Sequence, residues 1–145
     1  MNASTTAAGT STPLPVFIVE ASQAIRERLV DMIAAIDGTC CAGAATIAAI
    51  PDILQAHPDT VILDIRLPEG NGFDVLRALR HHAPGIQIYA VSNHATPAHR
   101  QLAYRLGASA FFDKTIEIEA MRELIAQRAA QRLRIYQYLN RTITQ

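Results

Sequence analysis

Residues 60–76 read TVILDIRLPEGNGFDVL, and they indicate the fold more clearly than any other stretch of the chain. Apolar and β-branched residues run without interruption up to Asp64, as in a strand that is buried on both faces of a sheet. A glycine-rich loop follows, and apolar residues then recur at helical spacing, at Phe73, Leu76 and Leu79. The stretch therefore predicts a strand, a loop and a helix in succession.

The same succession recurs on either side of this unit. Short apolar runs at 16–19, 86–91 and 110–112 each precede a helical pattern, and 39–42 is a weaker strand candidate. Continuous apolar strands that alternate with amphipathic helices are typical of a parallel sheet with helices on both faces. The sequence therefore predicts a single α/β domain built on a five-stranded, doubly wound parallel sheet.

Turn and capping residues refine the expected helices. Thr96-Pro97 predicts a helix start, because threonine caps the N-terminus and proline suits the first helical position. Asp37-Gly38 is expected to end the first helix, with Gly38 in the left-handed conformation of a C-terminal cap. Pro51 lies inside the helix expected over 46–57, and it predicts that this helix is short or kinked.

Composition and charge exclude several classes of protein. The chain has 145 residues, 50% hydrophobic and 18% charged, so it can bury a core and is not a disordered chain. Lys+Arg 13 balance Asp+Glu 13, which leaves no basic field to hold nucleic acid or an anionic membrane. No apolar run approaches the ~20 residues of a membrane span. The adjacent Cys40 and Cys41 suit neither a zinc site nor a disulfide, and they favour a reducing cytoplasm.

The chain divides into three expected regions. Residues 1–13 are rich in Ala, Ser, Thr and Gly and are expected to form a disordered leader. The α/β pattern fills residues 14–128. The final helix begins at about Glu117 and continues as an extension and tail over 129–145. No second domain that would read nucleic acid is expected.

Polar side chains follow four of the expected strands, and they are Glu20, Asp64, Ser92 and Lys114, the only lysine of the chain. Because the carboxyl ends of parallel strands meet at one edge of a sheet, these side chains are expected to converge there. Carboxylates bind a hard cation or act as nucleophiles, and an ammonium suits a phosphate oxygen. The set therefore fits phosphoryl transfer to a carboxylate. The alternative, ordinary polar strand termini, explains any one of these residues better than all four together.

Several motifs carry a resemblance to a known family. They are VFIVE at 16–20 followed by Arg26, VILDIRLPEGNG at 61–72, VS at 91–92, LGA at 106–108 and FFDK at 111–114. Taken in this order, they resemble the receiver domain of bacterial two-component response regulators, from Pro15 to about Arg128. The resemblance implies a flavodoxin-like sheet with the strand order 2-1-3-4-5.

The resemblance also implies a role for each residue at the strand ends. Asp64 would accept a phosphoryl group from a histidine kinase, a phosphotransfer protein or a small phosphodonor, and Lys114 would pair with that group. Ser92 would hydrogen-bond a phosphoryl oxygen and move inward. Phe111 would follow it as a rotating aromatic, and a plain core aromatic is an equal alternative for this residue.

Mg²⁺ is the cofactor that the resemblance implies. Its ligands would be the carboxylates of Glu20 and Asp64 and the backbone carbonyl of Arg66. The family usually has a second acidic residue after the first strand, where this chain has Ala21, so the site is expected to bind Mg²⁺ weakly. The family's lysine is usually followed by proline, and Thr115 stands in that place here.

Two interpretations of the function follow from these residues. The first is a stand-alone receiver, a cytoplasmic switch that is phosphorylated on Asp64 and signals through an unknown downstream protein. It would have no enzymatic activity beyond its own phosphorylation and dephosphorylation. The second is a degenerate receiver, a phosphorylation-independent interaction module. Asp64, Ser92 and Lys114 favour the first interpretation, whereas Ala21 and Thr115 favour the second.

The extension of the final helix predicts self-association. Beyond Arg128 it carries Leu133, Ile135, Tyr136 and Leu139, together with arginines and no acidic residue. A protruding helix with an apolar stripe needs a partner surface, and a homodimer through this helix is expected. The alternative is that the extension folds back on its own domain or frays.

Overall fold

The computed structural model describes residues 12–46, 50–66 and 71–144, so nearly all of the leader expected over 1–13 lies outside the described residues. The strands are β1 (Leu14–Val19), β2 (Thr39–Ala45), β3 (Thr60–Asp64), β4 (Gln87–Ser92) and β5 (Ala110–Asp113). The helices are α2 (Gln23–Ala34), α3 (Ile50–Gln55), α4 (Gly72–His82), α5 (Pro97–Arg105) and α6 (Ile118–Thr144).

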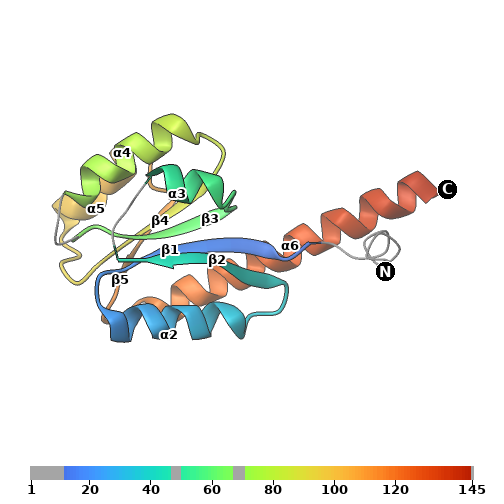
Figure 1. Ribbon diagram of the computed structural model, residues 1–145, viewed down its shortest axis with the longest axis horizontal. Coiled ribbons are helices and arrows are strands. Elements are labelled where there is room, and N and C mark those ends of the chain that lie inside the picture. Colours follow the sequence, from blue (N-terminus) through green and yellow to red (C-terminus); the bar gives the residue numbers. More distant parts are fainter. Residues whose placement is uncertain (1–11, 47–49, 67–70, 145) are drawn as a thin grey trace.

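The strands form one sheet with the order β2-β1-β3-β4-β5, which confirms the predicted topology. Each neighbouring pair is parallel, so the carboxyl ends of the strands lie at the same edge. Figure 1 shows α2 and α6 on one face of the sheet and α3, α4 and α5 on the other. The molecule is therefore a three-layer α/β sandwich.

Two apolar cores fill the spaces between the sheet and its helices. Every residue of β3 is buried, which explains the uninterrupted apolar run in the sequence. Alternate strand residues divide between the two faces: Ile18 and Ile62 pack with residues of α2 and α6. Val19 and Leu63 pack with residues of α3, α4 and α5. Both faces are close-packed, and this fixes the position of the sheet edge.

Pro51 has the expected effect on the helix that follows β2. The helix α3 has 6 residues, Ile50–Gln55, and Pro51 is the second of them. Proline is tolerated near the start of a helix, because the amides of the first turn have no partner within the helix. The described residues agree with the prediction of a short or kinked helix, and positions 47–49 of the expected range lie outside them.

The end of α2 differs from the prediction. Gly38 has the left-handed φ of 82° that the sequence predicts, but α2 already ends at Ala34 with Ala35 as its cap. The Ala35 amide still bonds carbonyls of the last turn, so the helix ends without a left-handed residue. Gly38 instead turns the chain into β2, and its carbonyl accepts a hydrogen bond of 2.7 Å from the Leu14 amide.

A close backbone contact fixes the chain after β3. Gly72, the first residue of α4, is buried, and its amide donates to the Ile65 carbonyl over 3.1 Å. A Cβ atom on Gly72 would lie 2.2 Å from that oxygen, so only glycine fits here. Asn71 caps α4 by accepting a hydrogen bond of 2.9 Å from the Phe73 amide. These contacts hold the start of α4 against the end of β3, where Asp64 lies.

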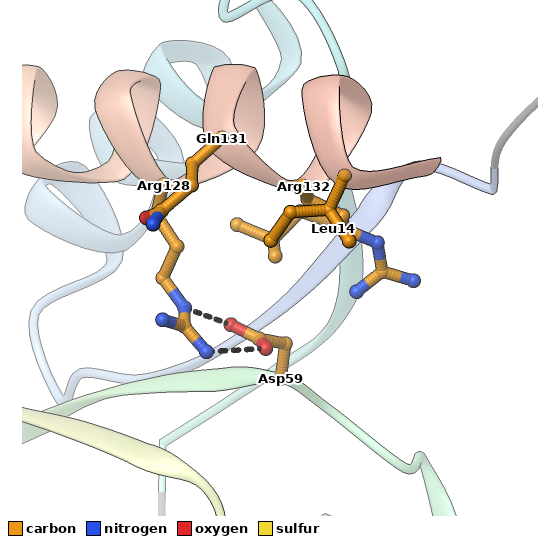
Figure 2. A pocket seen from close by; sticks show the side chains of 6 residues that line it. Leu14, Asp59, Arg128, Gln131 and Arg132 are labelled. Carbon is orange, nitrogen blue, oxygen red and sulfur yellow. Dashed lines mark hydrogen bonds and ion pairs between the residues drawn. The ribbon is translucent and has the colours of Figure 1, made fainter. Parts of the chain in front are cut away.

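An ion pair joins α6 to the residue that precedes β3, at the end of the sheet where the strands begin. Arg128 donates to Asp59 from Nε to Oδ2 at 2.7 Å and from Nη2 to Oδ1 at 2.8 Å (Figure 2). Burial alone would raise the pKa of Asp59, but hydrogen bonds from Arg128 and Thr60 outweigh it, and the pKa lies below its ordinary value. The pair borders a cavity of about 330 Å³ that Leu14 and Ile135 also line.

Beyond this ion pair, α6 continues as one helix past the sheet (Figure 1). Its large apolar side chains there are between 43% and 81% exposed, and they are Leu133, Ile135, Tyr138, Leu139 and Ile143. Within the described ranges, no helix is both long enough and apolar enough to cross a membrane.

Candidate functional site

Two carboxylates lie buried at the carboxyl edge of the sheet. Glu20 follows β1 and is 1% exposed, and Asp64 ends β3 and is 2% exposed. Val19 of β1 lies opposite Leu63 of β3, so the two residues that follow them are neighbours at the edge. Two buried like charges at adjacent positions are unfavourable unless a cation shares the site.

Lys114 supplies that cation. Its Nζ donates to Glu20 Oε1 at 2.9 Å and to Asp64 Oδ2 at 3.2 Å, and its side chain is 7% exposed. The Lys114 amide donates to the Ser92 carbonyl at 3.0 Å, which extends the pairing of β4 with β5. One ammonium therefore faces two carboxylates, and the cluster keeps a negative charge.

Each carboxylate is also oriented by its own loop. The Arg66 amide donates to Asp64 Oδ1 at 2.9 Å, and the Ser22 amide donates to Glu20 Oε2 at 3.0 Å. Arg26 Nη1 donates to the Glu20 carbonyl at 2.9 Å and so fixes the loop after β1. The carboxylate oxygens are therefore held in position by the protein itself.

Burial is the largest influence on Asp64, and it raises the pKa of this carboxyl above its ordinary value. The negative charge of Glu20 acts in the same direction, whereas the Arg66 amide and Lys114 act against it without cancelling it. A buried carboxylate with a raised pKa, beside a lysine at the edge where α/β proteins bind ligands, marks a candidate functional site.

The structure places Ser92 beside this cluster and Phe111 in the core. Ser92 ends β4 and is 1% exposed, and its Oγ accepts a hydrogen bond of 3.0 Å from the His94 amide. Because Asp64 pairs with Val91, Ser92 lies one residue further toward the carboxyl edge. Phe111 is buried in the apolar cluster on the α4 and α5 face.

Asp113 closes the turn that leads from β5 to α6. Its Oδ1 accepts a hydrogen bond of 2.7 Å from the Thr115 amide, and its carbonyl accepts one of 2.8 Å from the Glu117 amide. The turn after Lys114 is therefore held by side-chain and main-chain hydrogen bonds around Asp113, with Thr115 at the position where the family usually has proline.

The oxygen donors at this edge fit Mg²⁺ in kind. Glu20 and Asp64 supply buried carboxylates, and the main chain of Arg66 lies against Asp64 through its amide. Mg²⁺ usually takes one or two carboxylates from a protein and keeps several waters, and two buried carboxylates match that number. Ala21 adds no side-chain oxygen, and the described residues contain no group of three or more His, Cys, Asp or Glu side chains that could hold a metal.

A comparison with models of protein families shows which family this domain belongs to. The model of the response regulator receiver domain matches residues 16–126, a range that contains Glu20, Asp64, Ser92 and Lys114. The chain belongs to the response regulator receiver family. The resemblance that the sequence motifs predict is thereby confirmed, and so is the flavodoxin-like fold of this receiver domain.

The curated relatives of this receiver domain are longer proteins. The DNA-binding transcriptional activator DevR/DosR of Mycobacterium tuberculosis is 29% identical over 133 residues, which cover 81% of this chain and 60% of that protein. The regulatory protein LuxO of Vibrio cholerae is 34% identical over 88 residues, which cover 59% of this chain and 19% of that protein. The receiver chain therefore spans less than two thirds of the length of these relatives.

Solved structures share the fold of this receiver domain. The response regulator domain of Thermotoga maritima CheB matches with a TM-score of 0.70 at 23% identity, over 84% of this chain and 97% of that one. A chain of the CheX-CheY-BeF3-Mg+2 complex from Borrelia burgdorferi matches with a TM-score of 0.70 at 20% identity, over 83% and 89%. At these identities the likeness concerns the fold alone.

Sequence patterns miss some contacts around β5 of the receiver. Arg100 on α5 donates to the Phe111 carbonyl and forms an ion pair with Glu117. These two partners lie 11 and 17 positions further along the chain, and no periodicity connects them with Arg100. Folding alone brings these side chains together.

Proposed function

We propose that this receiver domain is a phosphorylation-controlled switch, which takes a phosphoryl group on Asp64 and passes the signal to another protein. The observation that carries the proposal is the pair of buried carboxylates that share the ammonium of Lys114. Asp64 ends the central strand β3, so Glu20 flanks it on one side and Ser92 on the other. It is the carboxylate around which the other polar groups gather.

The proposed transfer is an attack by a carboxylate on a phosphodonor. An oxygen of Asp64 forms a bond to phosphorus, the phosphorus–nitrogen bond of a donor phosphohistidine breaks, and the electron pair returns to that nitrogen, which water protonates. Lys114 would pair with the phosphoryl oxygens, and Ser92 Oγ would donate a hydrogen bond to one of them. Mg²⁺, held by Glu20, Asp64 and the Arg66 carbonyl, would supply further positive charge.

A groove beside Lys114 suits the docking of the phosphodonor. It has a volume of about 240 Å³ and lies between α2 and the start of α6. Its lining includes the apolar Ile25, Leu29 and Ile118 and the basic Arg28. An amphipathic helix of a histidine kinase or phosphotransfer protein would bury its apolar face there and bring its phosphohistidine to the side of Lys114.

The signal would leave through the neighbouring strands. Ser92 at the end of β4 would move toward the phosphoryl group, and Phe111 of β5 would follow it. Such a cluster biases an equilibrium between two arrangements that exist beforehand. The partner that reads the change would bind the face formed by α5, β5 and α6.

A second function is favoured by one observation, the alanine that follows Glu20. With Ala21, Mg²⁺ has fewer anionic ligands to bind. A degenerate receiver would keep the fold and the Lys114 bridges but take no phosphoryl group, and it would act as a constitutive interaction module. The two functions differ in one measurable product, an acyl phosphate on Asp64.

Phosphorylation of the purified protein decides between them. With Mg²⁺ and acetyl phosphate, intact mass spectrometry should show one added phosphoryl group that is labile to base. Asp64→Asn should abolish this adduct, and Asp74→Asn, which changes an exposed aspartate of α4, should keep it. An adduct that persists in Asp64→Asn excludes Asp64 as the acceptor. A wild type that forms no adduct at any Mg²⁺ concentration supports the degenerate receiver.

We also propose that the protein pairs with a second copy of itself through the extension of α6. Large apolar side chains are exposed along this part of the helix, among them Tyr138 and Ile143. Most of the stability of a helix in a protein comes from burial of its apolar face, and the apolar side chains of the extension are exposed. A second copy brings the same stripe, and two such helices would cover each other.

A further inference from the structure

Arg100 joins several elements on the face formed by α5, β5 and the start of α6. Its guanidinium carbon lies 5.1 Å from the centroid of the Phe111 ring, within the range of a cation–π contact. Its Nη1 donates to the Phe111 carbonyl at 3.2 Å, and its Nη2 donates to Glu117 Oε1. One arginine thus contacts the ring of Phe111, the main chain of β5 and the residue that precedes α6.

Glu117 extends this cluster toward the candidate site. Its Oε1 also accepts a hydrogen bond of 2.8 Å from the Asp113 amide. The hydrogen bond from Arg100 lowers the pKa of Glu117 below its ordinary value, so this carboxylate is charged at neutral pH. Asp113 immediately precedes Lys114, whose ammonium bridges the two buried carboxylates. The contacts of Arg100 therefore end one residue away from the site.

Phe111 is fully packed beside this cluster. The residue is 3% exposed and belongs to the apolar core together with Ala90 and Ala103. The side chains of Arg100 and Glu117 are 34% and 32% exposed, so they form a half-exposed layer next to the buried ring. The guanidinium of Arg100 therefore lies over the Phe111 ring, and its ion-pair partner Glu117 is partly exposed.

We infer that Arg100 is a positioning residue that holds Phe111 in its buried position, so that the face formed by α5, β5 and α6 is set before Asp64 is phosphorylated. The meaning of the buried ring for signalling rests on the proposed function, whereas the role of Arg100 in holding the ring does not. If the Phe111 ring is already buried in most molecules, phosphorylation of Asp64 can shift the equilibrium between its exposed and buried positions only a little further. Arg100 therefore limits the response of this face to the phosphoryl group.

Fluorine NMR can measure the position of Phe111. Incorporation of 4-fluorophenylalanine labels all 4 phenylalanines of the chain, and Phe111→Leu assigns the resonance of interest. The exposure of the ring is then read as line broadening by a soluble gadolinium chelate. Phe17 serves as the internal reference, because it is buried in the same apolar cluster and lies on β1.

Arg100→Ala should expose the Phe111 ring. Loss of the cation–π contact and of a charge-assisted hydrogen bond is expected to raise the broadening roughly fivefold. Arg100→Lys keeps the charge but lacks the planar fork, and it should give an intermediate value. Arg77→Ala removes a 70% exposed arginine of α4 and should leave the broadening unchanged.

Glu117→Gln provides a second variant that keeps both Arg100 and the ring. It removes the ion pair and should also give intermediate broadening, so it decides the matter if Arg100→Ala does not fold. If Arg100→Ala folds and its Phe111 resonance is broadened no more than in the wild type, the inference is overturned. If Arg100→Ala does not fold, the same result in Glu117→Gln overturns it.

Beryllofluoride with Mg²⁺ tests the connection to Asp64. On its addition the Phe111 resonance should shift less in the wild type than in Arg100→Ala, where it should move back toward the wild-type position. A wild-type resonance that moves as far as that of the variant overturns the inference. If beryllofluoride does not bind the wild type at all, the proposed phosphorylation fails, and the broadening measured without it still decides the role of Arg100.

Discussion

At the scale of single residues, Lys114 is one positive charge set against two buried negative charges. Buried carboxylates lose their hydration, and one ammonium restores only part of that loss. The arrangement is unfavourable for folding and favourable for a site that must accept a further ligand. The charge of Asp64 therefore lowers the stability of the fold while it serves the proposed function.

Asp64→Asn should stabilise the fold at neutral pH. The pKa of Asp64 is raised, chiefly by burial, so the folded state disfavours the charged form and loses stability as the pH rises through the folded pKa. The gain from asparagine should be full at pH values above the folded pKa of Asp64 and vanish below the unfolded pKa of about 3.9. A gain on the order of 1 kcal/mol would raise Tm by about 3 °C, which thermal unfolding at several pH values measures. A variant less stable than the wild type at neutral pH contradicts this account.

Ala21→Asp should strengthen the metal site. One added charge-assisted contact is worth on the order of 2 kcal/mol, or about tenfold or more in Mg²⁺ affinity. The phosphorylation rate should therefore reach half its maximum at a lower Mg²⁺ concentration than in the wild type. Glu20→Ala should lose the binding that remains, and Ala21→Asn controls for size without charge. Identical titrations of the wild type and Ala21→Asp would mean that position 21 does not reach the metal.

At the scale of elements, one arginine joins the loops that precede β4 and β5. Arg80 of α4 donates from Nε to the Gly107 carbonyl at 2.9 Å and from Nη1 to the carbonyls of Pro84 and Ile86 at 2.9 and 2.8 Å. Its Nη2 donates to Ser109 Oγ at 3.3 Å. Without this side chain, the carbonyls of Pro84, Ile86 and Gly107 would lose the hydrogen bonds that it donates.

Arg80→Ala should destabilise the fold by about 2–3 kcal/mol, because it removes several hydrogen bonds to a charged donor at once. Arg80→Lys should recover only a small part of this, since an ammonium cannot reach the same carbonyls with a planar fork. Urea unfolding measures the free energy of unfolding, with Arg77→Ala as the exposed control. A loss within about 0.5 kcal/mol would place Arg80 among ordinary surface residues.

Local patterns predict the elements of this fold well. The apolar run before Asp64 and the Thr96-Pro97 helix start both correspond to observed elements, because burial of a strand and capping of a helix depend on adjacent residues. The end of α2 is mispredicted, because the left-handed Gly38 belongs to the turn before β2 and not to the helix cap. A glycine near a helix end is thus a weaker signal than a capping pair.

The candidate site is predictable in outline only. Parallel strands bring Glu20, Asp64 and Lys114 to one edge, and the sequence shows which residues end the strands. The sequence does not show that one ammonium bridges both carboxylates. Lys114 lies 50 positions after Asp64 and 94 positions after Glu20 in the chain, so the bridge depends on how folding places the three side chains. The contacts of Arg100 lie beyond local patterns for the same reason.

At the scale of the whole molecule, the extension of α6 should determine the oligomeric state. The full chain is expected to be a dimer by light scattering, and a chain that ends at Arg128 is expected to be a monomer. No acidic residue follows Glu123, so two paired extensions bring like charges together. Added salt screens this repulsion and should tighten the dimer.

Two variants of the extension test the same surface. Leu139→Ala removes an apolar side chain that is 51% exposed and should weaken the dimer, whereas Gln137→Ala should not. Salt that weakens the association would indicate that the extension binds an acidic surface of the second copy and not its extension, which contradicts the proposed helix pairing. A full chain that is monomeric at every salt concentration, like the chain ending at Arg128, excludes the proposed pairing.

The burial of the only lysine gives the protein a natural proteolytic probe. An endoprotease specific for lysine has a single peptide bond to cut, between Lys114 and Thr115, and the lysine side chain it must recognise is 7% exposed. Cleavage therefore requires the turn between β5 and α6 to open, and the disappearance of intact chain on a gel counts the opening events. A ligand that binds only the closed form slows this digestion by the factor 1 + [L]/Kd, so the affinity for Mg²⁺ or beryllofluoride can be read without any label.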